Sequence, residues 1–123
     1  MIKSILLVGL GGGIGSILRY LCQRWVTMLY PHHFFWGTFA VNIIGCFLIG
    51  LLWGISLRSF ESNVNFKLLL MVGLCGGFTT FSAFTLEGIG LLKENRTWLF
   101  FAYIAGSVIA GLLATFVGMK IAR

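Results

Sequence analysis

The chain has 123 residues, of which 59% are hydrophobic and only 10% are charged, and its mean hydropathy is +0.99. Soluble domains carry about 25% charged residues. Too few charges therefore remain here to cover a water-facing surface, which excludes a soluble globular protein, a disordered chain and an extended nucleic-acid binder. The net charge of +6 favours an anionic lipid surface or an anionic cargo. We expect one domain over residues 1–123, embedded in a membrane.

Charged residues divide the sequence into four apolar stretches, each long enough to cross a bilayer. A hydrocarbon core of about 30 Å takes about 20 helical residues. We therefore predict an all-α integral membrane protein with transmembrane helices at 3–29, 34–57, 66–92 and 97–121. A first membrane helix also explains the apolar N-terminus better than a removed signal peptide does.

Successive loops of such a protein alternate between the two sides of the membrane. The basic residues on one side are Lys3, Arg58, Lys67, Lys120 and Arg123, and those on the other are Arg24, Lys93 and Arg96. This split gives only a weak orientation signal under the positive-inside rule. The chain could insert both ways, which allows an antiparallel dual-topology homodimer.

Small residues recur at helical spacing in the first and fourth predicted helices. They are Gly9, Gly11, Gly12, Gly13 and Gly15 in the first, and Gly106, Ser107, Ala110, Gly111, Ala114, Thr115 and Gly118 in the fourth. Small residues let helix backbones approach closely in lipid, so these stripes predict helix packing. Arg19 lies deep in the first helix, where its side chain either extends to the interface or keeps a vestibule positive and attracts anions.

The second helix carries a polar stripe, with Thr38, Asn42 and Cys46 spaced four residues apart on one face. The amide of Asn42 offers two donors and an acceptor. Contact with an ion and a hydrogen bond between helices explain this residue equally well.

The third helix contains a paired glycine, Gly76-Gly77, near its middle. Glycine weakens a helix interior by about 1 kcal/mol relative to alanine, so the pair predicts a break at mid-membrane depth. Broken helices in transporters expose carbonyl oxygens that coordinate cations. A flexible pair of packing glycines is the alternative.

Beyond this point, Phe81, Phe84 and Thr85 share one helix face, with Ser82 and Glu87 on its two sides. The edge of a phenyl ring is positive and can meet an anion, although packing in the core or against lipid is the alternative for both rings. Glu87 is the sole intramembrane acid and could pair with a cation, titrate, or hold water in a vestibule.

Catalytic chemistry is nearly absent from the sequence. It contains no aspartate, and its two histidines are the adjacent His32 and His33 in a predicted interfacial turn. No Ser-His-Asp constellation and no metal-ligand spacing exists. We therefore expect no enzyme.

The third-helix string GLCGGFTTFSAFTLE (73–87) strongly resembles the signature of the Fluc/CrcB fluoride channels. The segments GGGIGSILRY (11–20) and GTFAVN (37–42) are similar to the same family, so the resemblance covers the whole chain. It implies a fluoride-selective channel in the bacterial inner (plasma) membrane that exports fluoride passively from the cytoplasm. It also implies an antiparallel homodimer in membrane lipid, with two pores and a structural sodium ion at its centre.

The resemblance also assigns roles to individual residues. The expected pore residues are Phe81, Phe84, Asn42, Ser82, Thr85 and Thr38, with Tyr103 and Thr115 as additional pore-side candidates. The vestibule residues are Arg19 and Glu87, and the sodium ligands are the backbone carbonyls of Gly76 and Thr79. Ala83 departs from the family pattern, because a hydroxyl residue is expected there, so one donor of the polar track is missing.

Two other functions compete with this one. A small dual-topology proton-coupled multidrug transporter needs a deep carboxylate in its first helix, where this chain has Arg19. A non-transporting membrane assembly subunit would conduct no ions and would need no broken third helix.

Overall fold

The structure is a computed structural model that describes every residue except 31–34, 59–62 and 123. All regular structure in the described part of the chain is helical. Its elements are α1 (Ile2–Leu29), α2 (Phe35–Arg58), α3 (Val64–Phe66), the π-helix η1 (Lys67–Cys75), α4 (Gly76–Phe78), α5 (Ser82–Lys93) and α6 (Thr97–Ala122).

Four helical stretches are long and apolar enough to cross a bilayer: Ile2–Leu29, Phe35–Leu57, Val64–Lys93 and Thr97–Ala122. These stretches confirm the predicted all-α, four-span architecture, and their described ends lie within two residues of the predicted ones. The predicted turn at His32-His33 and the predicted start of the second helix at residue 34 fall outside the described residues.

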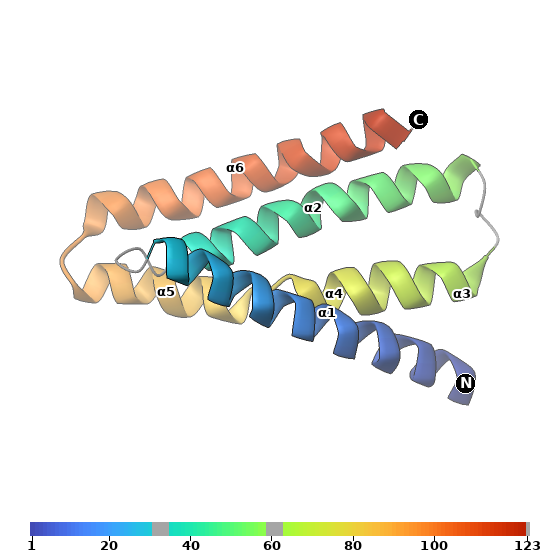
Figure 1. The fold of residues 1–123 in the computed structure, drawn as a ribbon. Helices are drawn as coiled ribbons and strands as arrows, with labels where there is room; N and C mark the ends of the chain where they lie inside the picture. The colour runs from blue at the N-terminus through green and yellow to red at the C-terminus, as the bar shows by residue number, and fades with distance from the viewer. Residues whose placement is uncertain (31–34, 59–62, 123) are drawn as a thin grey trace.

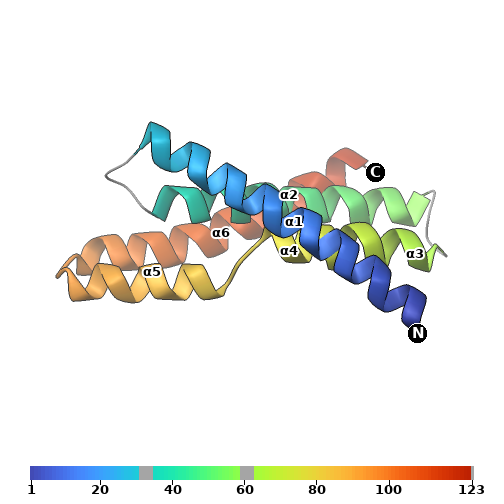
Figure 2. The ribbon, with the colours of Figure 1, turned by 60° about the horizontal axis from the view of Figure 1, so that its bottom comes forward.

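The four stretches run alternately up and down, so both termini lie at the same end of the bundle (Figure 1). The end of α2 and the start of α3 lie at that end too, and the turn between α5 and α6 is at the opposite end. Helix α2 packs along α6, while α1 crosses η1 and α4 obliquely (Figure 2). The alternating direction of the described helices agrees with the assignment of the basic residues to two sides.

The third stretch leaves the helix between α4 and α5, which corrects the predicted position of the break, because Gly76 and Gly77 are both helical in α4. Helix α4 ends at Phe78, and Thr79 has the extended dihedrals φ −87° and ψ 158°. Helix α5 begins at Ser82, after Phe81 at φ −90° and ψ −35°. Figure 2 shows this interval as a non-helical connection beneath the crossing of α1.

Several helix contacts are so close that only glycine fits, and Gly15 and Gly118 lie at two of them. A Cβ atom on Gly15 would collide with the carbonyl oxygen of Leu74, and one on Gly118 would collide with that of Phe47. These contacts join α1 to η1 and α6 to α2, which confirms the packing role predicted for both residues. Gly13, by contrast, has nothing within 4 Å of its Cβ position.

We predict that Gly15→Ala lowers the free energy of unfolding by about 1–3 kcal/mol, because the added methyl group must push α1 away from η1. The matched control is Gly13→Ala, two residues along the same helix, which we expect to be neutral or stabilising because alanine is the better helix former. Circular dichroism during denaturant titration in detergent micelles measures both. Equal stability of the two variants would contradict the packing argument.

Candidate functional site

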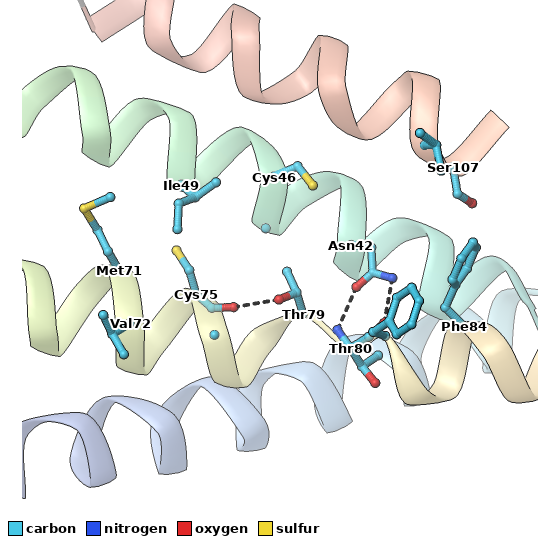
Figure 3. A pocket seen from close by; sticks show the side chains of 14 residues that line it. Asn42, Cys46, Ile49, Met71, Val72, Cys75, Thr79, Thr80, Phe84 and Ser107 are labelled. Carbon is cyan, nitrogen blue, oxygen red and sulfur yellow. Dashed lines mark hydrogen bonds between the residues drawn. The ribbon is translucent and has the colours of Figure 1, made fainter. Parts of the chain in front are cut away.

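Asn42 on α2 binds both backbone groups of Thr80 in the interval between α4 and α5 (Figure 3). Its Nδ2 donates to the Thr80 carbonyl oxygen at 2.9 Å, and its Oδ1 accepts from the Thr80 amide at 2.8 Å. Thr80 lies outside a helix and therefore needs partners for both groups. Asn42 thus makes the interhelical hydrogen bonds that its sequence position allowed, and its amide keeps one further N–H donor.

Other polar groups form hydrogen bonds at the end of α4 and at the start of α5. The Arg19 Nε donates to the Gly77 carbonyl oxygen at 3.1 Å, across from α1. Both the amide and the hydroxyl of Thr79 donate to the Cys75 carbonyl oxygen, each at 3.0 Å. The Ala83 amide donates to the Thr80 hydroxyl at 3.2 Å. Arg19 therefore binds the end of α4, which neither of its two predicted roles included.

Three carbonyl groups in α4 and the interval after it accept no hydrogen bond from any described residue: those of Gly76, Phe78 and Thr79. The helical partner of the Gly76 carbonyl would be the Thr80 amide, which binds Asn42 instead. Likewise the Ala83 amide, which could have reached Thr79, binds the Thr80 hydroxyl. The two predicted sodium ligands, Gly76 and Thr79, are thus among the carbonyls left free for another partner.

A cavity of about 620 Å³ lies beside this interval, between α2, the third stretch and α6 (Figure 3). Most of its lining is apolar. The cavity brings together five of the predicted site residues, namely Asn42, Gly76, Thr79, Phe81 and Phe84.

The rings of Phe81, which precedes α5, and Phe84, within α5, lie in different surroundings. The ring centroids are 5.9 Å apart with an interplanar angle of 43°. Phe81 is 75% exposed. Phe84 is buried and packs against Tyr103, with 5.1 Å between the centroids. Phe84 therefore belongs to the core of this chain as well as to the wall of the cavity.

Ser107 on α6 also lines the cavity, opposite Asn42 and near Phe84 (Figure 3). Its hydroxyl oxygen is buried and has no hydrogen-bond partner among the described residues. In the sequence, Ser107 belongs to the small-residue stripe, which predicts packing alone. The missed signal is its position one helical turn after Tyr103, on the same face of α6.

Four polar side chains form a continuous hydrogen-bonded chain across the bundle. Gln23 Nε2 donates to Thr38 Oγ1 at 3.1 Å, and Thr38 Oγ1 donates to Glu87 Oε2 at 2.7 Å. The Tyr103 hydroxyl donates to Glu87 Oε1 at 3.0 Å. The chain takes one residue from each of the four membrane stretches. Three of the four are candidate residues in the sequence. Gln23 is not, although its position one helical turn after Arg19 places the two on the same face of α1.

The remaining candidates are more dispersed. Ser82 and Thr85 are exposed near the start of α5, and the Thr85 hydroxyl donates to the Ser82 carbonyl oxygen at 2.9 Å. Thr115 lies in the α2–α6 contact, where its hydroxyl donates to the Cys46 carbonyl oxygen at 3.0 Å. Ser82 and Thr85 therefore lie next to the two phenylalanines in the chain without lining the cavity, and Thr115 lies apart from them in the α2–α6 contact.

Comparison with known proteins gives a consistent result. Residues 6–119 match the family model described as CrcB-like protein, Camphor Resistance (CrcB). A protein of Phocaeicola vulgatus is 49% identical over 95% of this chain and 96% of its own length, and one of Rhizobium etli is 46% identical over 96% and 94%. A protein of Flavobacterium psychrophilum is 45% identical over 98% of both chains. Each of the three relatives is named a fluoride-specific ion channel FluC.

We predict that Asn42→Leu lowers the free energy of unfolding by about 1–3 kcal/mol, because it leaves the amide and carbonyl of Thr80 without partners. Asn42→Gln keeps the amide donor and acceptor on a side chain one methylene longer, so its loss should be smaller. Denaturant titration in detergent micelles measures both. A stability ranking in which Gln is as harmful as Leu would contradict the two-bond arrangement.

Proposed function

The chain belongs to the CrcB-like family, and from this premise we propose that it is a fluoride-selective ion channel that exports fluoride passively from the cytoplasm. Membership confirms the resemblance found in the sequence, and it assigns the chain to a family of ion channels and not to an enzyme family. The protein is a multi-pass protein of the bacterial inner membrane.

The main observation behind the proposal is that two aromatic rings and two hydrogen-bond donors lie around one cavity. Fluoride is small and strongly hydrated, so a selective path must replace its water with several correctly spaced donors. Two such donors are the second amide proton of Asn42 and the hydroxyl of Ser107, which has no partner among the described residues. The positive edges of the Phe81 and Phe84 rings add weaker ones, and the exposed Ser82 and Thr85 hydroxyls would continue the path along α5.

The parts of this chain that are left uncovered support an antiparallel homodimer with two pores. Three apolar residues that line the cavity, Val72, Phe81 and Val108, are each more than half exposed. Gly76 beside them is also exposed and has nothing within 4 Å of its Cβ position. A second copy inserted in the opposite orientation would cover this face and present the same residues again.

The free carbonyl oxygens of Gly76 and Thr79 fit a structural sodium ion at the centre of such a dimer. Unwound backbone carbonyls are the groups that hold sodium in membrane transporters. A carbonyl without a partner is also costly at membrane depth. Two copies would bring two such pairs together, and the ion would neutralise the partial negative charge that the carbonyls concentrate there.

We predict that Phe81→Ile slows fluoride efflux from proteoliposomes by about ten-fold, equivalent to about 1.4 kcal/mol in the barrier. The reason is that the variant replaces a ring edge with an aliphatic surface that has no positive rim. Phe116→Ile is the matched control, because Phe116 is an exposed phenylalanine on α6 outside the cavity lining. A fluoride-selective electrode records efflux, and size-exclusion chromatography checks that the dimer persists.

The same assay separates the competing functions. Efflux driven by a proton gradient alone would indicate a coupled transporter, and no efflux of fluoride at all would indicate an assembly subunit. Chloride efflux equal to that of fluoride would contradict selectivity.

We predict that fluoride efflux depends on sodium. When sodium is replaced by N-methylglucamine at equal ionic strength from purification onward, efflux should fall several-fold, and it should recover when sodium is restored. Equal efflux in the two cations would contradict a structural role for sodium at Gly76 and Thr79.

A further inference from the structure

We propose that Gln23 is a positioning residue for anion passage: it fixes the Thr38 hydroxyl as a hydrogen-bond donor at the Glu87 end of the fluoride path. This inference rests on the proposed channel function and adds a residue that has no role in it so far.

The direction of the hydrogen bonds carries the argument. A threonine hydroxyl has a single proton. Because Thr38 Oγ1 accepts from Gln23 Nε2 at 3.1 Å, that proton is free to point at Glu87 Oε2, 2.7 Å away. If the Gln23 amide presented its oxygen instead, Thr38 would donate to Gln23 and Glu87 would lose one of its two donors.

The Thr38 hydroxyl has few other ways to be oriented. Thr38 is only 1% exposed, so bulk water does not compete for its hydrogen bonds. The position of Gln23 is set by backbone contact as well, because a Cβ atom on Gly37 would lie 3.4 Å from the Gln23 Cα. Helix α1 therefore approaches the start of α2 at a glycine, and this approach brings the glutamine amide within reach of Thr38.

The same donors that hold Glu87 are suited to an anion. The hydroxyls of Thr38 and Tyr103 each donate to one oxygen of the carboxylate. An anion that moves through this end of the bundle would compete with the carboxylate for these two hydroxyls. A hydrogen bond received from Gln23 also strengthens the donor character of the Thr38 O–H, because linked hydrogen bonds polarise one another.

The test compares four proteins in fluoride efflux from proteoliposomes: the unchanged protein, Gln23→Met, Thr38→Val and the double variant. Methionine keeps the length of glutamine and removes its donor. We expect Gln23→Met to slow the rate constant of efflux about two- to ten-fold, the range that one hydrogen bond is worth. If Gln23 acts through Thr38, the double variant is no slower than Thr38→Val alone.

Two further measurements separate positioning from a structural role. Damage to folding lowers the fraction of vesicles that release fluoride, whereas loss of positioning lowers the rate in the vesicles that do. Tyr20→Phe serves as the matched control, because it removes an exposed polar group from the same part of α1. If Gln23→Met does not fold, Gln23→Asn takes its place, since its shorter side chain withdraws the amide from Thr38.

Failure of the inference and failure of the proposed function are distinguishable. No fluoride efflux from the unchanged protein overturns the channel function itself. Normal efflux that Gln23→Met leaves unchanged, or a double variant in which the two losses add, overturns the role of Gln23 alone.

Discussion

The structure depends on one constraint, which is that backbone polar groups inside a bilayer must find partners within the protein. Residues 79–81 leave the helix between α4 and α5, and helical hydrogen bonding is lost there. Asn42 on α2 binds the backbone of Thr80, and Arg19 on α1 binds the carbonyl oxygen of Gly77. The cavity and the free carbonyl groups lie around the same interval. The residues with the clearest chemistry are therefore also those that allow the interval to exist.

The charged group inside the bundle also finds its partners within the protein. The chain carries +6 overall, yet its one intramembrane acid, Glu87, accepts a hydrogen bond on each of its carboxylate oxygens. A negative group inside a bilayer is unfavourable unless such donors compensate it. The hydroxyls of Thr38 and Tyr103 partly compensate this charge. The guanidinium of Arg19 is a positive group near the end of α4.

Much of the fold could be predicted from the sequence, because the four apolar stretches and their length are direct consequences of bilayer thickness. The cavity residues Asn42, Phe81 and Phe84 could be named as well, since polar and paired aromatic residues stand out in an apolar chain. The hydrogen-bond partners of these polar residues could not be predicted. The contact between Arg19 and Gly77 joins residues 58 positions apart and depends on the angle at which α1 crosses α4. Gln23 and Ser107 were missed for a related reason: the rotation of a helix about its axis decides which of its polar residues meet a neighbour.

The free carbonyl groups have a consequence for how the protein is made. In a chain newly inserted into lipid, the Gly76 and Thr79 oxygens accept no hydrogen bond from the described residues, which costs free energy. Longer helices in the same chain would not supply the missing partners. Its folded state is then linked by mass action to whatever reaches those oxygens. If a second copy of the chain supplies that partner, as proposed above, the stability of the folded chain rises with the density of copies in the membrane.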